Sequence, residues 1–541
     1  MCNNHSIPNK KTTKEEKHIH DQEHSKWNRR SFIQALGLAG AGSMMLGANS
    51  VTASAPSPLS VALAGSDNDN ILVIVRLKGG NDGLNTIVPV YDYANYANLR
   101  PTIRHQQSDL FMLNSDFGIP DYLSPGLEAI WGDGKMKVVH GVGYPDQNLS
   151  HFRSSDIWAS TDAVNIEPTG WWGRYFEDLY PDYLVNPPST PPAVQIGSIG
   201  NLVFEGMDNN YAFAVANPEQ LANVAQNGTV HDVLDIPDCV YGDKLLYMRS
   251  TTNTTFLYAG VINDAYMAAT NDANYDPNAD LANQLAIVAR LIKGGLGTKV
   301  YMVTLDGFDT HANQVDQHRR ILEDVANSMK SFYEDLGATG MDTNVLSMTI
   351  SEFGRRPYEN GSLGTDHGAA SPVLLFGPGL EGSGFVGQHP DITEWDNNDN
   401  LIPTSDFRDV YSSILTDWFC LDPTVLDLIL LGQTYESLDL GFNCNPLGIQ
   451  DYGNVTRLVH RPTYQNDRTY IEIQMPVTAH TTIKLYDILG KEIATLKNEI
   501  LFPGQHKIDV SAAVNTNLSF GQYIYRITAG GQNYSKSIMV K

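Results

Sequence analysis

Six acidic and imidazole side chains follow short apolar runs at widely separated points of the chain. They are Asp82, Asp309, His311, Glu352, Asp366 and His367. Carboxylate and imidazole together are the ligand set of Zn²⁺, Mn²⁺ and similar divalent ions. Any one of these residues alone is as well explained by a loop cap or a surface turn. The set taken together favours a metal site or a catalytic site.

The apolar runs predict the strands that must position these residues. Residues 71–77 form an apolar run typical of a buried parallel strand, and a glycine-rich turn with Asp82 follows at once. Further strands are predicted at residues 137–140, 299–304, 345–350 and 373–376, and helices at 281–293 and 314–336. Strands that alternate with helices indicate an α/β fold, a mostly parallel sheet with helices on both faces. Because the carboxyl ends of parallel strands share one edge, where such sheets bind ligands, we expect the six residues to converge there.

Length and charge narrow the class of protein. A chain of 541 residues is expected to contain two or three domains. Its formal net charge of -25 argues against nucleic acid as a partner, because binding to the phosphate backbone needs basic patches. An acidic chain suits a soluble secreted protein or one that collects divalent cations, although the acid is also explained by solubility alone.

Cysteine usage is sparse, with four cysteines in the whole chain. Their spacing contains no CxxC and so suggests neither a zinc ribbon nor a thioredoxin site. Cys420 and Cys444 can form a disulfide outside the cytoplasm, which leaves Cys239 as a thiol. Three buried thiols are the alternative.

The N-terminal segment reads as an export signal. NRRSFIQ at residues 28–34 resembles the twin-arginine signal, and a weakly apolar run to residue 48 follows it. Ala62-Leu63-Ala64 offers a signal-peptidase site, so residues 1–64 are expected to be a leader that engages the twin-arginine translocase. The alternative is a chance arginine pair before a membrane anchor. Twin-arginine export carries folded proteins, which agrees with a metal loaded before export.

The C-terminal segment changes to short strands of period two, such as Ile471, Ile473 and Met475. This spacing predicts an all-β immunoglobulin-like sandwich over residues 461–541, after a linker at 436–460. IKLYDILGKEI at 483–493, GQYIYR at 521–526 and YSKSIMVK at 534–541 resemble the type IX secretion (Por) sorting domain. The resemblance implies recognition by the outer-membrane type IX machinery, and secretion or attachment at the cell surface. The alternative is a carbohydrate-binding or generic immunoglobulin-like module.

Five strings in the central segment occur in a fixed order. They are LKGGNDGLN at 77–85, SHFRSSDIW at 150–158, GFDTHANQ at 307–314, EFGR at 352–355 and GTDHG at 364–368. Together they resemble the bacterial DUF1501 family over about residues 70–435, within a domain placed at 65–435. That family is related to the alkaline phosphatase and sulfatase superfamily, so the resemblance implies that fold.

The resemblance also implies roles for individual residues. Asp82 would be the ligand after the first strand and would share its metal with Asp366 and His367. Asp309 and His311 would bind a second ion. Ser150 or a neighbouring residue would be the nucleophile, and Arg153 or Arg355 would hold anionic oxygens of the substrate. A final histidine ligand is expected downstream, where His389 is available. The alternative is that His151 is a ligand and Ser150 has no role.

Two functions therefore remain open for the central domain. The first is a metal-dependent hydrolase, with Zn²⁺ or Mn²⁺ as cofactor, that acts on anionic phosphate or sulfate esters. The second is a non-catalytic surface or binding protein on a degenerate phosphatase-like fold. The acid and histidine set favours the enzyme, whereas the lack of a secure nucleophile and third histidine favours the binder.

Overall fold

The computed structural model describes residues 69–540 except 185, 198–199, 229, 234–235, 237–239, 422, 443, 445–458, 466–467, 476–477, 488–490, 503, 511–517, 519–520 and 530–531. The predicted leader at residues 1–64 lies outside the described residues. Within the described part, the chain forms two compact units. The first comprises Asp69–Ile414 and Asp427–Phe442, and the second Leu415–Leu426 and Asn443–Lys541.

A mostly parallel sheet forms the centre of the first unit, as predicted. Its strand order is β13-β5-β12-β9-β1-β8-β6-β7. Only β12 is antiparallel to its neighbours β5 and β9. The strands are β1 (Ile71–Lys78), β5 (Met136–Gly143), β6 (Ala193–Ile196), β7 (Ala212–Val215), β8 (Val300–Asp306), β9 (Val345–Ser351), β12 (Ser371–Phe376) and β13 (Gly384–Val386).

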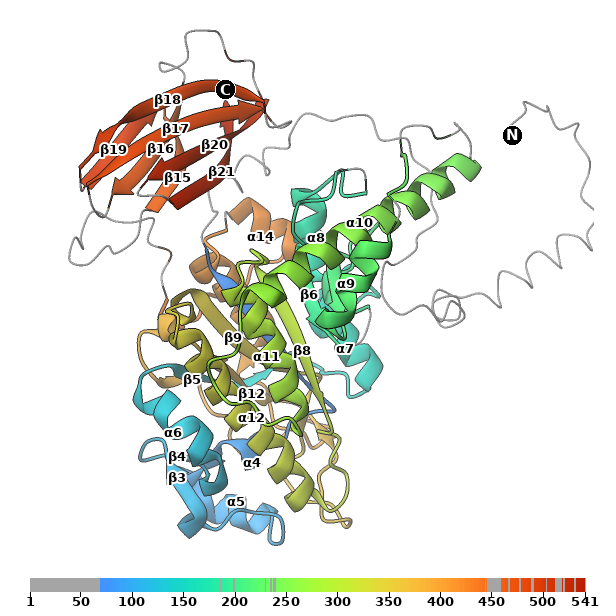
Figure 1. Cartoon of the computed structure of the whole chain (residues 1–541). Coiled ribbons are helices and arrows are strands. Elements are labelled where there is room, and N and C mark those ends of the chain that lie inside the picture. The colour runs from blue at the N-terminus through green and yellow to red at the C-terminus, as the bar shows by residue number, and fades with distance from the viewer. Residues whose placement is uncertain are drawn as a thin grey trace, which may run out of the picture. The chain divides into compact units, whose positions relative to one another are not determined.

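Burial along β1 shows why this sheet is a core element. Successive residues of a strand point to opposite faces, and Leu72, Val73, Ile74 and Val75 are all fully buried. Both faces of β1 are therefore covered. Helices α11 (Asp280–Lys293) and α12 (Gln314–Gly337) lie over one face of the sheet in Figure 1. Both helices were predicted from the sequence, at residues 281–293 and 314–336.

Residues 160–280 complete the sheet and its cover. They form α8 (Trp171–Leu179), β6, β7, α9 (Pro218–Asn227) and the long α10 (Val240–Ala268). Trp171 and Trp172 are fully buried, and Trp171 stacks on Tyr411 of α13 (Phe407–Ser413) at a centroid distance of 4.3 Å. The tryptophan pair is thus part of the core packing.

The second unit contains two antiparallel sheets that share one apolar core, which confirms the predicted all-β domain. The alternating residues named from the sequence, Ile471, Ile473 and Met475 among them, are buried in that core. One sheet has the order β15-β16-β19 and the other β18-β17-β20-β21. The strands are β15 (Val459–Gln465), β16 (Arg468–Met475), β17 (Ala479–Asp487), β18 (Glu492–Leu501), β19 (Gly504–Asp509), β20 (Gly521–Ala529) and β21 (Gln532–Val540).

Cys420 and Cys444 form a disulfide in the second unit, in agreement with the first of the two alternatives. Among the described helices, none is both long enough and apolar enough to cross a membrane.

Candidate metal centre

The carboxyl ends of three central strands lie at one edge of the sheet. Lys78 at the end of β1 pairs in register with Asp306 at the end of β8, and Leu77 pairs with Ser351 at the end of β9. The residues that follow these strands are therefore neighbours. They include Asp309 and His311 after β8 and Glu352 after β9.

Three imidazoles converge on the Asp309 carboxylate at this edge. The Nε2 atom of His367 lies 3.1 Å from Asp309 Oδ1, and that of His311 lies 3.2 Å from the same oxygen. The third ring belongs to His151, the first residue of α7 (His151–Ser160), whose Nε2 lies 3.5 Å from Asp309 Oδ2. Four donor residues from three separate chain segments thus surround one small volume.

The other ring nitrogen of each histidine is held by an acceptor. His151 Nδ1 lies 2.7 Å from Glu352 Oε2, and His311 Nδ1 lies 3.1 Å from Asp366 Oδ1. His367 Nδ1 lies 2.8 Å from the carbonyl oxygen of Leu149. An acceptor at Nδ1 fixes the proton there and leaves the Nε2 lone pair available, which is the usual arrangement of histidines that bind metals.

The spacing of the donor atoms fits a metal ion. His311 Nε2 and His367 Nε2 are 2.9 Å apart, and with Asp309 Oδ1 they form a triangle whose other sides are 3.1 and 3.2 Å. Donors at about 2.1 Å from one ion lie about 3.0–3.4 Å from each other. Suitable donor atoms of His151, Asp309 and His367 also lie within 4.8 Å of one another. Facing lone pairs at such distances repel unless a cation or a proton lies between them.

The protonation of two of these donors suits the same purpose. Burial lowers the pKa of His367, which favours the neutral ring that a metal needs. Partial burial opposes ionisation of Asp309, but the hydrogen bond and positive charge of Arg355 outweigh it and lower the pKa of that carboxyl. Asp309 is therefore a carboxylate over the whole neutral range.

Gly79 and Gly364 allow their loops to approach the segment that contains Asp309 and His311 closely. Gly79 has a φ of +121°, and a Cβ there would lie 2.4 Å from the backbone nitrogen of Asp309. A Cβ at Gly364 would lie 2.4 Å from the backbone of His311. Contacts this short exclude a larger residue without displacement of backbone, so both positions need glycine.

Asp366 and Glu352, which were expected to be direct ligands, orient the histidines. Asp366 receives a hydrogen bond from Asn360 Nδ2 at 3.1 Å and holds His311. Glu352 is buried and receives the backbone N–H of Gly79 and the Arg76 guanidinium, both at 3.0 Å. Its remaining capacity holds His151. The two carboxylates are thus hydrogen-bonded to the Nδ1 atoms of His151 and His311, whereas the Nε2 atoms of these rings lie near Asp309.

Asp82 does not join the donor cluster, contrary to the expectation. Its carboxylate is fully buried and receives Arg100 Nη1 at 2.8 and 2.7 Å, together with the Gln314 amide. Burial alone would raise the pKa of Asp82, but Arg100 outweighs it and lowers the pKa. Gln314 in turn accepts hydrogen bonds from Thr310 and Thr365. Asp82 is therefore connected through Gln314 to the loop that contains Thr310 and to the loop that contains Thr365.

Arg355 and Arg153 are also placed differently from the expectation that they hold substrate oxygens. The Arg355 guanidinium is buried and donates to Asp309 and to carbonyl oxygens of Gly79, Gly80, Phe308 and Thr365. Arg153 donates to carbonyl oxygens of Asp162 and Asn165. Both guanidinium groups tie loops together.

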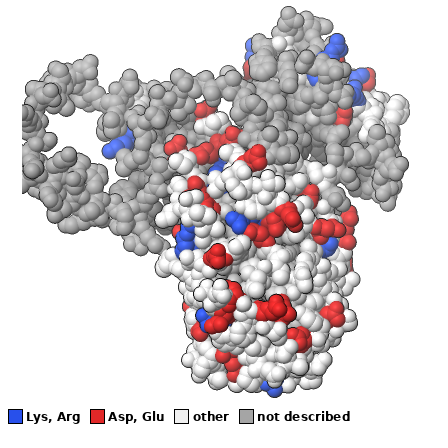
Figure 2. All heavy atoms as spheres, turned by 180° about the vertical axis from the view of Figure 1, so that it is seen from behind, with Lys and Arg blue, Asp and Glu red and all other residues white. Residues whose placement is uncertain are grey.

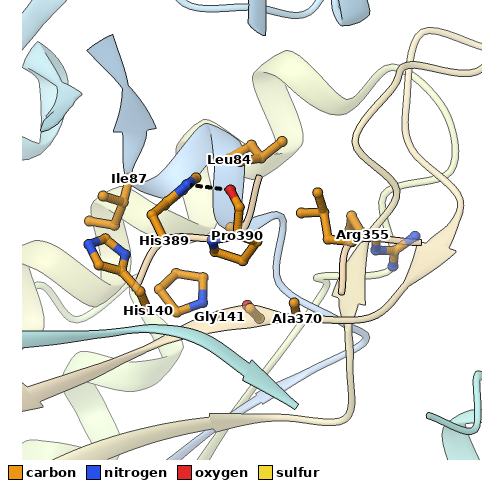
Figure 3. A pocket seen from close by; sticks show the side chains of 12 residues that line it. Leu84, Ile87, His140, Gly141, Arg355, Ala370, His389 and Pro390 are labelled. Carbon is orange, nitrogen blue, oxygen red and sulfur yellow. Dashed lines mark hydrogen bonds between the residues drawn. The ribbon is translucent and has the colours of Figure 1, made fainter. Parts of the chain in front are cut away.

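Ser150 is exposed and precedes His151 at the start of α7, where its side chain makes no capping hydrogen bond. His389 lies elsewhere, in the pocket of Figure 3, with His140 and the apolar side chains Leu84, Ile87 and Pro390. Its Nδ1 lies near the Tyr91 hydroxyl and the Pro390 carbonyl oxygen. Among the residues that the structure describes, no carboxylate lines that pocket, so the predicted ligand role of His389 does not fit its position.

Sequence reasoning missed Arg76, Arg100, Gln314 and Asn360. A charged residue inside an apolar strand was a usable signal for Arg76, because buried cations are usually paired. The other three are ordinary polar residues whose partners are distant in sequence, and nothing in their local pattern marks them.

Two family models match the chain, one almost entirely in the first unit and the other in the second. The model of the family described as "Protein of unknown function (DUF1501)" matches residues 257–416, and that of the "Secretion system C-terminal sorting domain" matches residues 462–541. The chain carries a DUF1501 segment and a type IX sorting domain. The DUF1501 segment holds Asp309, His311, Glu352, Asp366 and His367, whereas His151 comes from outside it. The sorting domain supports secretion or attachment at the cell surface through the type IX system.

A search of curated proteins finds no match to the chain. Among solved structures, similarity is found to Ps i-CgsB in complex with k-i-k-neocarrahexaose, at 9% identity over 76% of this chain and 83% of that chain, with a TM-score of 0.29. A protein in the alkaline phosphatase superfamily from Vibrio parahaemolyticus is 8% identical over 82% of this chain and 80% of that chain, with a TM-score of 0.28. The PsFucS1 sulfatase from Pseudoalteromonas sp. is 10% identical over 81% of this chain and 83% of that chain, with a TM-score of 0.28. Likeness at these TM-scores carries no argument about activity.

Proposed function

We propose that the first unit binds one divalent metal ion, Zn²⁺ or Mn²⁺, and hydrolyses phosphate or sulfate esters. The observation that carries this proposal is the convergence of three imidazole Nε2 atoms on Asp309, with every Nδ1 atom held by an acceptor. His151, Asp309, His311 and His367 would hold the ion. When bound, the ion supplies Lewis-acid polarisation of an ester oxygen and lowers the pKa of a coordinated nucleophile.

The residues of the chain contribute orientation and a nucleophile. Glu352 and Asp366 fix two of the rings, and Arg355 fixes Asp309. We propose Ser150 as the nucleophile, because its exposed hydroxyl is next to His151 and is not used as a helix cap. Its Oγ would bond to phosphorus or sulfur as the ester bond to the leaving oxygen breaks, and the serine proton would pass to that oxygen. Water would then cleave the serine ester and restore the hydroxyl.

The test loads the purified chain with Zn²⁺ or Mn²⁺ and measures metal content and the release of 4-nitrophenol from 4-nitrophenyl phosphate, sulfate and phosphodiesters. We expect about one ion per chain and hydrolysis that Asp309→Asn abolishes, whereas the matched control Asp306→Asn retains both. Asp306 is an exposed carboxylate three positions away that pairs with Lys78. If the loaded wild type holds no ion, the proposal is wrong. Loss of turnover in Ser150→Ala with retained metal supports the nucleophile, and unchanged turnover assigns the attack to water.

A non-catalytic binding protein is the second candidate. The observation that favours it is the Asp82–Arg100 pair, because Arg100 occupies the carboxylate expected to serve the other ion of a two-metal site. Stoichiometric metal without hydrolysis of any ester in the test would select this candidate.

We also propose that residues 1–64 direct export by the twin-arginine translocase, on the strength of NRRSFIQ and the following apolar run. Replacement of Arg29 and Arg30 by lysine is expected to retain the precursor in the cytoplasm, as measured by fractionation. Unchanged export of that variant would refute the assignment.

A further inference from the structure

Large apolar side chains are exposed in the chain segments next to the donor residues. Phe152, which follows His151, is 70% exposed, and Val164 and Ile166 are each 87% exposed. Leu363, three residues before Asp366, is 44% exposed. We call these four residues the apolar rim. Single exposed apolar residues are common on proteins, but a group that flanks a polar site marks a binding surface.

The loop that carries Val164 and Ile166 folds back against α7, whose first residue is His151. Arg153 donates to the carbonyl oxygen of Asn165 at 2.7 Å, and Arg153 is only two positions after His151. The Asp162 carboxylate accepts the backbone N–H groups of Val164 and Asn165, both at 2.8 Å. The loop is thus fixed by hydrogen bonds at both ends, and its apolar side chains are presented to solvent.

Leu363 is held in a conformation that leucine rarely adopts. Its φ is 60°, in the left-handed region that favours glycine. Asn360 fixes this loop by accepting the N–H groups of Ser362 and Gly364 at 2.9 and 3.1 Å. A strained, exposed apolar residue next to ligand residues indicates a position that serves binding.

Charge at the centre disfavours substrates that carry many negative groups. The carboxylates of Asp309 and Asp366 are 46% and 48% exposed. The three nearby arginines already have partners, namely Arg355 and Arg153 on carbonyl oxygens and Arg76 on Glu352 and Ser155. Figure 2 shows that acidic groups are prominent among the charged groups on the face of the molecule that it presents. A single anionic group can be neutralised by the ion, but further anions would find no unpaired arginine among these three.

We propose that the substrate is an ester of low charge with an apolar substituent, and that the apolar rim binds this substituent while the metal centre holds the ester group. This inference rests on the proposed hydrolase function and assigns its substrate class. It selects alkyl or aryl esters over polyanionic chains. Burial of methylene groups on the rim supplies the preference.

The experiment uses the metal-loaded full chain and two phosphodiesters with one leaving group, methyl and hexyl 4-nitrophenyl phosphate. We expect kcat/KM to be about tenfold higher for the hexyl ester, because the added methylenes are partly buried on binding. Calorimetry with methylphosphonate and hexylphosphonate gives a second readout that needs no turnover. Phe152→Ser and the double variant Val164→Ser/Ile166→Ser are expected to reduce both hexyl-to-methyl ratios to within about twofold of one.

Val230→Ser is the matched control, since Val230 is 75% exposed between α9 and α10, and it should keep the wild-type ratios. Metal content and circular dichroism confirm that each variant is folded and loaded. Equal rates for the two esters, with equal affinities for the two phosphonates, would contradict the proposed role of the apolar rim but not the proposed hydrolase function. A preference for hexyl that survives both rim variants would also contradict the proposed role of the rim. Absence of any hydrolysis would overturn the proposed function, and phosphonate binding would then decide the rim separately.

Discussion

Two groups of histidines in the first unit have opposite surroundings. His151, His311 and His367 are partly exposed, and a carboxylate or a carbonyl oxygen holds each Nδ1. His140 packs face to face on Phe385 with ring centroids 4.9 Å apart, His389 lies beside it, and His140 Nε2 has no hydrogen-bond partner. Burial lowers the pKa of His140 to about 3 and that of His389 to about 4. The Asp309 carboxylate, on which the first group converges, has no counterpart among the described residues that line the pocket of the second group, and this distinguishes the proposed metal ligands from the neutral core cluster.

The first way to break this comparison is to remove one histidine from each group. His367→Ala is expected to weaken Zn²⁺ or Mn²⁺ binding by more than about 100-fold, and Asp366→Asn, which loosens His311, by about 10–100-fold. His389→Ala should leave the affinity within about twofold of wild type, because no carboxylate lines its pocket. Calorimetric titration with the metal measures all three. Similar losses for His367→Ala and His389→Ala would show that the two groups do not differ as described.

A smaller effect is expected from pH on the buried group. The folded-state pKa values of His140 and His389 lie below the ordinary value, so the unfolded chain binds more protons between about pH 6.5 and 3. Their contribution to stability is complete above pH 6.5 and is lost as the pH falls toward 3. The free energy of unfolding should drop by about 5 kcal/mol more between pH 7 and 4.5 in wild type than in His140→Gln/His389→Gln, because each histidine contributes about half of this difference.

Urea unfolding at the two pH values measures this difference, and replacement of the exposed His231 by glutamine is the control. An identical pH slope in wild type and the double variant would show that the buried pair does not titrate on unfolding.

Much of the fold was predictable because the local patterns agree with the tertiary structure. The apolar run before Asp82 is β1, and the helices predicted at residues 281–293 and 314–336 match α11 and α12. Residues that follow parallel strands lie at one edge of the sheet, as expected from the sequence, and Asp309, His311 and Glu352 are neighbours there because β8 and β9 both pair with β1.

The exact membership of the site was not predictable, because it depends on distant partners. Arg100 pairs with Asp82 from 18 positions away, and nothing around Asp82 announces that a cation will take its carboxylate. The difference between Asp309, which points into the cluster, and Asp366, which stands behind it, depends on side-chain geometry within one loop pair. His389 was predicted to be a ligand, but its neighbours in the structure are rings rather than acids. These rings come from other segments of the chain, so the sequence around His389 does not reveal them.

The Arg355 guanidinium has a consequence for how fast the proposed metal ion would enter and leave. It joins the loops after β1 and β8 and the segment around Thr365 through buried hydrogen bonds. The donors therefore stand in place before any ion arrives, unlike those of small metal domains that fold only with their metal. Exchange of the ion should be limited by loss of its hydration water rather than by ordering of the chain, so a chelator can empty and a metal salt refill the centre without refolding.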